Sequence, residues 1–201
     1  MRQTYLVPPL FLSATDFVDY VRGLKFVSWR PRLPYLHNTG VPSLHQIKAG
    51  KVNELAWGVN LEHYYRGLGW HAGPHAVACP DGIVCLSDFT MPGVAQSCSN
   101  DRAWAIEMLG NYEKGADDFA SGDGAKVRDN AAKAIAVMAE KMEWDDLAFY
   151  YFNVKGLHFH HECVQDHHAC PGSLVVKSDM LTRIAANRAL LRAVHSTDLI
   201  A

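Results

Sequence analysis

The sequence has no surplus of basic residues and no long apolar run. Its 19 lysines and arginines are outnumbered by 21 acids, which gives a formal net charge of -2. Proteins bind nucleic acid through clustered positive charge, so we predict no nucleic-acid partner. The first ten residues, MRQTYLVPPL, hold only a short apolar run broken by Pro8 and Pro9. That run is too short for a signal sequence or a membrane span, so we expect cytoplasmic synthesis and no stable membrane association.

The chain has few cysteines, and their number is odd. The five cysteines lie at positions 79, 85, 98, 163 and 170. An odd number in a chain of 201 residues is a poor basis for a disulfide framework. We therefore expect one cysteine to bind a metal and the others to be buried free thiols.

The apolar pattern predicts an alternation of strands and helices. Helices are expected over 13–24, 53–70, 125–144 and 178–195. A hairpin is expected over 75–89, a buried strand over 103–110, and strands that end at His37 and at 158–160. This alternation predicts an α/β fold with a mixed central β-sheet flanked by helices.

We expect one domain over residues 1–201. Its predicted parts are an N-terminal helical extension (1–30), a catalytic core (31–175) and a closing C-terminal helix (176–201). The two histidine-bearing strands and the strand that carries Glu107 can lie side by side in the sheet. Their ends then meet at one edge, where sites form in such folds.

The segment HHECVQDHHACPG, residues 160–172, concentrates four histidines, two acids and two cysteines. Zinc binds imidazole nitrogen and thiolate sulfur, and catalytic zinc sites have three protein ligands. The candidates are His37, one of His160 and His161, and Cys170, and the soft thiolate favours zinc over magnesium or calcium. Because neighbouring strand residues face opposite ways, only one histidine of the pair can join Cys170. The alternative is a solvated histidine loop beside a buried thiol.

Four motifs in fixed order resemble type 2 N-acetylmuramoyl-L-alanine amidases, the zinc-dependent fold shared with peptidoglycan recognition proteins. They are LHNT at 36–39, GW with PHAVACPDG at 69–82, SNDRAWAIEMLGN at 99–111 and HHECVQDHHACPG at 160–172. Together they span most of the chain. In that family two histidines and a cysteine or aspartate bind zinc, and the matching positions are His37, His160 and Cys170.

The resemblance also implies catalytic roles for Glu107 and His168. The spacing from His160 to Cys170 is similar to that in cytoplasmic anhydro-muropeptide amidases, whose strand glutamate matches Glu107 and whose basic residue before the last ligand matches His168. Glu107 would relay the proton of the attacking water, and His168 would donate to the developing oxyanion. The alternative for Glu107 is a structural acid paired with Arg102.

Substrate contacts are less clearly marked. Many family members carry a tyrosine before the histidine that matches His75, and Pro74 takes its place here. The segment GVAQSCSN, residues 93–100, lacks the histidine usual in the family. We expect Gln96 or Asn100 to supply polar contacts, and we treat His75 and Trp70 as further substrate-binding candidates, with core packing as the alternative for Trp70.

The resemblance implies hydrolysis of the amide between N-acetylmuramic acid and L-alanine in peptidoglycan or muropeptides. We expect a monomeric phage or prophage endolysin that reaches the wall through a holin pore. The alternatives are a cytosolic muropeptide-recycling amidase, a zinc peptidase acting within the stem peptide, and a non-catalytic peptidoglycan-binding domain.

Overall fold

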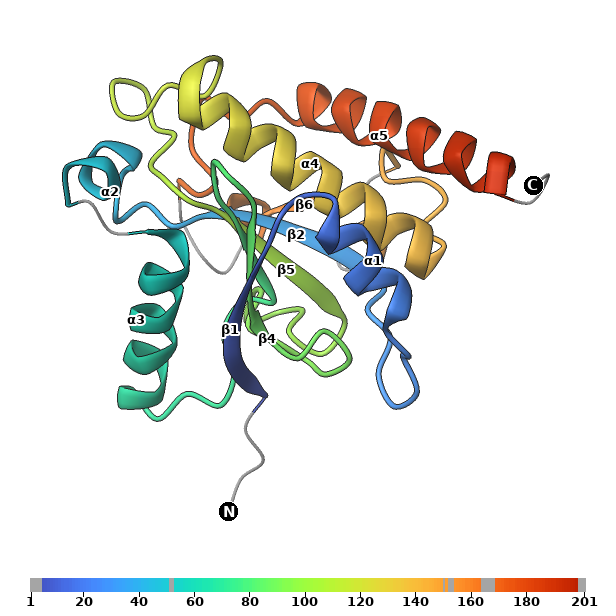
Figure 1. Cartoon of the computed structure of the whole chain (residues 1–201), viewed down its shortest axis with the longest axis horizontal. Coiled ribbons are helices and arrows are strands. Elements are labelled where there is room, and N and C mark those ends of the chain that lie inside the picture. Colours follow the sequence, from blue (N-terminus) through green and yellow to red (C-terminus); the bar gives the residue numbers. More distant parts are fainter. Residues whose placement is uncertain (1–4, 51–52, 150, 152–153, 164–168, 199–201) are drawn as a thin grey trace.

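The computed structural model describes residues 5–50, 53–149, 151, 154–163 and 169–198. Within them, six strands form one mixed sheet in the order β1-β4-β3-β5-β2-β6 (Figure 1). The strands are β1 (Leu6–Leu12), β2 (Leu33–Asn38), β3 (Ala76–Ala78), β4 (Ile83–Ser87), β5 (Ala103–Met108) and β6 (His158–Phe159). The helices are α1 (Asp16–Gly23), α2 (Leu44–Gly50), α3 (Glu54–Gly67), α4 (Gly122–Met142) and α5 (Lys177–Asp198), with a 3-10 turn η1 (His160–Glu162). The predicted mixed sheet with flanking helices is confirmed.

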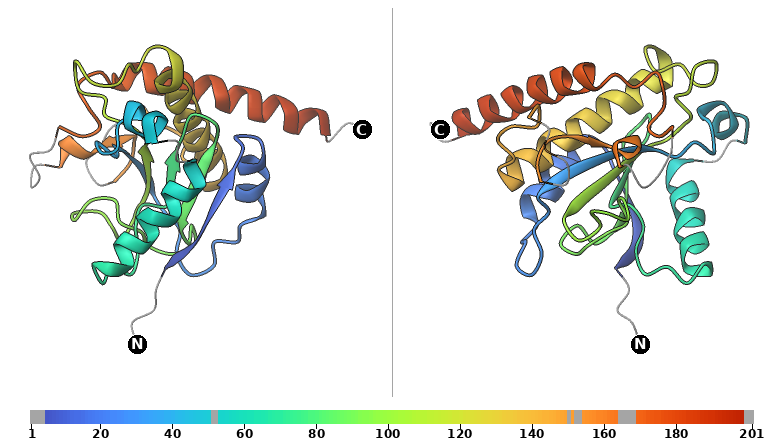
Figure 2. Two further views of the ribbon diagram at one scale, coloured as in Figure 1. Left: turned by 60° about the vertical axis from the view of Figure 1, so that its left-hand side comes forward. Right: turned by 180° about the vertical axis from the view of Figure 1, so that it is seen from behind.

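Helices cover both faces of the sheet (Figures 1 and 2). Helix α4 lies against one face, with α1 and α5 packed beside it, and α3 covers β1 and β4 on the other. Because α4 is buried between the sheet and α5, small residues are needed along it, and Ala131, Ala132, Ala134, Ala136 and Ala139 are all fully buried. None of the described helices combines the length and apolarity that a membrane span requires.

The alternation of side chains along β2 and β5 separates core residues from site residues. Leu36 and Ile106 point into the large core with α4. Tyr35 and Ala105 point to the opposite face, and in a strand His37 and Glu107 must follow them there. The face away from α4 therefore receives both chemistry-bearing side chains.

The N-terminal part differs from the prediction. Residues 1–30 were expected to form a helical extension, but β1 joins the sheet as one of its two outer strands, antiparallel to β4, and α1 is the helix in this part of the described chain. Prolines weaken a strand pattern in the sequence, yet an edge strand tolerates them because one side of its backbone needs no partner. The register shifts between Leu6 and Leu10, where Pro8 and Pro9 lie. Helix α2 was also missed.

We predict opposite effects for two alanine substitutions in α3. A β-carbon at Gly58 would lie 2.7 Å from Cγ1 of the buried Val84, whereas one at Gly67 would meet nothing within 4 Å. Gly58→Ala should lower the free energy of unfolding by about 1–3 kcal/mol, because β-branched Val84 is held in the core. Gly67→Ala should raise it by up to about 1 kcal/mol through helix propensity. Urea unfolding of both variants measures this, and equal effects would contradict the close packing of α3 on β4.

Candidate metal centre

Strand pairing brings the predicted ligands and the predicted acid together. Parallel β2 and β5 place His37 directly beside Glu107. On its other edge β2 pairs with β6, where Leu36 lies beside Phe159. His160 follows Phe159 at the start of η1 and therefore lies level with His37. The chain returns through Cys170, whose carbonyl accepts a hydrogen bond from the backbone N–H of His161 at 3.0 Å.

His37, His160 and Cys170 form a compact group of three ligand atoms. The Nδ1 atoms of His37 and His160 are 3.2 Å apart, and Cys170 Sγ lies 3.7 Å from His37 Nδ1. All three atoms lie within 4.8 Å of one another. Tetrahedral zinc with ordinary bond lengths requires N–N separations of about 3.3 Å and N–S separations of about 3.6 Å. The two separations measured from His37 Nδ1 are therefore close to those that a zinc ion would need.

The thiol of Cys170 is partly buried, and a backbone N–H is directed at it. Burial raises the pKa of the Cys170 thiol to about 12, while the hydrogen bond from the backbone N–H of Asn38, at 3.2 Å, acts to lower it. A backbone N–H directed at a thiol favours its deprotonated form, and a bound cation would stabilise that thiolate further. Two imidazoles and one such thiol match the three-ligand set of catalytic zinc sites.

The geometry brings His160, and not His161, into the candidate ligand group. His160 belongs to the ligand group. His161 is exposed, its Nδ1 lies 3.1 Å from the carbonyl of Cys170, and its ring packs edge-on against Phe159. His161 thus helps to hold the turn but does not reach the ligand group.

The three ligands open into a cavity of about 390 Å³. Its walls come from β2, β5, the end of α3 and the loop after β4. The other lining residues are Asn38, Thr39, Gly40, Tyr65, Trp70, Pro74, Val94, Ala95 and Glu107. Trp70 is 45% exposed and stacks on Tyr65, with ring centroids 5.2 Å apart, which makes a flat aromatic wall. This placement agrees with the predicted substrate-binding role of Trp70, which stays a prediction.

Glu107 lines the cavity, is partly buried, and forms no ion pair with any of the described residues. Burial alone raises the pKa of its carboxyl to about 7. The alternative partner, Arg102, instead pairs with Asp101 at 2.9 Å. A carboxyl with a pKa near neutrality can both accept and donate a proton at physiological pH. A cation held by the three ligands would lower this pKa.

Three of the residues predicted to contact substrate do not line the cavity. His75 is fully buried, with Nδ1 accepting from the backbone N–H of Ala105 at 3.0 Å and Nε2 3.0 Å from the carbonyl of Met91. Gln96 is 4% exposed. Asn100 accepts from the backbone N–H groups of residues 95 and 96 at 2.7 and 2.8 Å. Their positions give them a structural role, since they pack the core and shape the loop that forms one wall.

His168, the predicted oxyanion donor, lies outside the described residues.

Sequence reasoning missed the support of the turn that carries His160. Glu162 accepts from the backbone N–H of Phe159 at 2.7 Å and pairs with Lys177 at the start of α5. Lys177 also donates to the carbonyl of Leu157 at 2.8 Å. Glu162 is the third residue after Phe159, which is the spacing of the glutamate in a capping box, but Phe159 has no side-chain acceptor, so the sequence carries only half of that signal.

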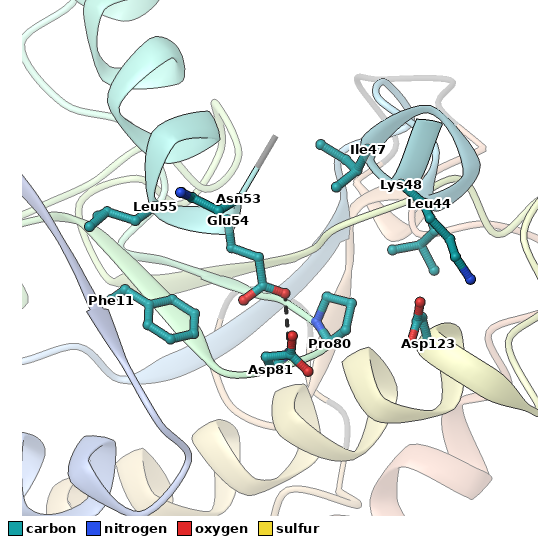
Figure 3. Close-up of a pocket in the computed structure, with 10 residues that line it drawn as sticks. All are labelled: Phe11, Leu44, Ile47, Lys48, Asn53, Glu54, Leu55, Pro80, Asp81 and Asp123. Atoms are coloured by element: carbon teal, nitrogen blue, oxygen red, sulfur yellow. Dashed lines mark hydrogen bonds between the residues drawn. The ribbon is translucent and has the colours of Figure 1, made fainter. Parts of the chain in front are cut away.

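A larger groove elsewhere on the molecule lacks the histidine and cysteine side chains of the candidate site. The groove between α2, the start of α3 and the β3–β4 turn has a volume of about 500 Å³ (Figure 3). Its acids have partners, because Glu54 accepts from the backbone N–H of Asp81 at 3.1 Å and Lys126 pairs with Asp123 at 3.0 Å. Its lining includes neither histidine nor cysteine. The smaller cavity is therefore the better candidate for the site.

Solved structures with this fold include peptidoglycan recognition proteins and amidases. Drosophila PGRP-LB has a TM-score of 0.55 and 18% identity, with 80% of this chain and 86% of that chain covered. The endolysin N-acetylmuramoyl-L-alanine amidase LysCS of Clostridium intestinale URNW has a TM-score of 0.52 and 15% identity, with 92% and 93% covered. The hydrolase AmiA of Staphylococcus aureus, in complex with its ligand, has a TM-score of 0.55 and 17% identity, with 95% and 96% covered.

These similarities confirm the predicted amidase and peptidoglycan-recognition fold. No family model matches the sequence, and no curated protein matches it. At this level of identity the shared property is the fold, so the chemistry must be argued from the side chains.

We predict that Glu107→Gln stabilises the metal-free protein at neutral pH. The carboxyl has a higher pKa in the folded state, about 7, than its ordinary value of 4.5, so its ionisation opposes folding. This cost is complete above pH 7 and vanishes as the pH falls to about 4.5, where both states are protonated. The gain in unfolding free energy should be on the order of 1–3 kcal/mol near about pH 8 and close to zero near about pH 4. Urea unfolding at the two pH values measures it, and a pH-independent effect would contradict the burial of this charge.

Proposed function

We propose that this protein is a zinc-dependent N-acetylmuramoyl-L-alanine amidase. The observation that carries the proposal is the convergence of His37, His160 and Cys170, whose ligand atoms lie within 4.8 Å of one another, in a cavity that also holds Glu107. The fold shared with LysCS and AmiA supports the same activity. A binding-only domain needs neither the thiol nor the acid, and partial burial of the acid costs free energy.

Each of these side chains would have a distinct role in amide hydrolysis. His37, His160 and Cys170 would hold the zinc ion, which supplies a Lewis acid that polarises a carbonyl and activates water at neutral pH. Glu107 accepts the proton of the attacking water and returns it to the leaving amine of L-alanine, which its near-neutral pKa allows.

The rest of the cavity positions the substrate. The wall formed by Tyr65 and Trp70 offers a flat apolar surface for a sugar ring or a peptide stem. In the predicted role, His168 donates a hydrogen bond to the oxyanion as the carbonyl is attacked. These surrounding residues would place the scissile bond between Glu107 and the ligand group.

We propose lysis of the cell wall, as an endolysin made in a host cytoplasm, as the biological setting. The likeness to LysCS, which is described as an endolysin, supports this setting. Recycling of soluble muropeptides is the alternative, and the choice of substrate separates the two.

Metal analysis tests the ligand set. Wild type should bind one zinc per chain, and Cys170→Ala should bind it at least about 10–100-fold more weakly, because a ligand matters no less than the residues that orient ligands. His161→Ala is the matched control and should retain zinc with nearly the wild-type affinity. Competition with a chromogenic chelator measures both affinities. Wild-type affinity in Cys170→Ala, or an equal loss in His161→Ala, would contradict the assignment.

Product analysis tests the bond and the acid. Wild type should release stem peptides with a free amino group on L-alanine and leave the glycan intact, with faster turnover on whole sacculi than on soluble muropeptides. Glu107→Gln should retain zinc and lose about 10²–10⁴-fold in kcat. Mass spectrometry of the products identifies the bond.

Each other outcome excludes part of the proposal. New ends deeper in the stem would indicate a peptidase, and binding of sacculi by the zinc-loaded protein without any cleavage would indicate a recognition domain. Faster turnover of soluble muropeptides would favour the recycling setting.

A further inference from the structure

Two cysteines that take no part in the ligand group lie against each other. The Sγ atoms of Cys98 and Cys163 are 2.7 Å apart, although 65 residues separate them in the chain. Since a disulfide bond is about 2.05 Å long, little movement is needed to join them.

The pair lies beside the candidate metal centre. Cys163 ends the turn that carries His160, and its backbone N–H donates to the His160 carbonyl at 3.1 Å. Cys98 belongs to the loop of residues 93–100, which supplies one wall of the cavity. Its Sγ lies 4.0 Å from the hydroxyl of Tyr35, whose ring stacks on His37 at 5.9 Å between centroids. A bond between the two sulfurs would therefore join the turn of one ligand to the loop behind another.

Access to the thiols favours reaction at Cys98. Cys163, Cys79 and Cys85 are buried, while Cys98 is partly exposed. Cys170 is also partly exposed, but it belongs to the ligand group, where a bound metal would protect its sulfur. Cys98 is thus the thiol that a small oxidant meets first, with Cys163 in contact to complete the reaction.

We propose that Cys98 and Cys163 form a redox-responsive disulfide that fixes the His160 turn to the loop 93–100. The oxidant is a low-molecular-weight disulfide. The thiolate of Cys98 attacks one of its sulfurs and releases one thiol, which leaves a mixed disulfide on Cys98. The thiolate of Cys163 then attacks Cys98 Sγ and releases the second thiol. Two protein thiols and one small disulfide become one protein disulfide and two small thiols.

The cross-link constrains a long stretch of chain. It closes a loop of about 65 residues and reduces the freedom of the unfolded state, which raises thermal stability. It also restrains the turn that carries His160. Slower loss of zinc follows from this, and that consequence alone rests on the proposed function.

The test compares oxidised and reduced forms of the full-length, zinc-loaded protein. Wild type, Cys98→Ala and Cys163→Ala are incubated with oxidised or reduced glutathione, and Cys79→Ala serves as a control that removes a thiol outside the pair. Non-reducing peptide mass spectrometry detects the cross-link, and thermal unfolding gives the difference in Tm between the two forms of each variant. Because each variant is compared with itself, its baseline stability does not enter.

Oxidised wild type and Cys79→Ala should contain the Cys98–Cys163 peptide and melt roughly 5–15 °C above their reduced forms. Cys98→Ala and Cys163→Ala should show neither change. Zinc should pass to a chelator several-fold more slowly from oxidised than from reduced wild type.

Three results would overturn the inference. They are absence of the linked peptide in oxidised wild type, a linked peptide with unchanged Tm, and an equal rise in Tm in Cys98→Ala. A linked peptide and a raised Tm in a protein that binds no zinc would refute the proposed function and leave the disulfide standing.

Discussion

The parallel pairing of β5, β2 and β6 is the constraint on which the site depends. It sets His37 beside Glu107 and brings the residue after β6, His160, level with both. A shift of one residue in either register would turn these side chains toward α4, where the core has no place for them. The large apolar core under α4 therefore fixes the register, and the register places the chemistry on the opposite face. The same strand pairs therefore determine both the packing of the core and the position of the site.

The face with the site carries groups that burial disfavours. The carboxyl of Glu107 and the thiol of Cys170 both have raised pKa values because they are removed from water. A fold under selection for stability alone would place apolar side chains there. A bound cation would favour the ionised forms of both groups, because it attracts the thiolate and a nearby carboxylate. Under the proposed function, the protein would therefore reach its full stability only with a metal bound.

The sequence predicted most of what lies along single elements. The strand ending at His37, the strand of Glu107 and the Ala-rich helix α4 follow from clear periodicity, and they are confirmed. The strand β1 was missed because Pro8 and Pro9 interrupt its pattern, and only the sheet shows that it is an edge. The burial of His75 was not predicted for another reason. Its bonds to backbone atoms of Ala105 and Met91 are long-range contacts that the sequence does not record.

Zinc-edge X-ray absorption of the loaded wild-type protein tests the central claim most directly. The account predicts a first shell with two imidazole nitrogens at about 2.0–2.1 Å and one sulfur at about 2.3 Å, completed by a light oxygen or nitrogen atom. A shell without sulfur, or one with two or more sulfurs, would contradict the grouping of His37, His160 and Cys170 as the metal ligands.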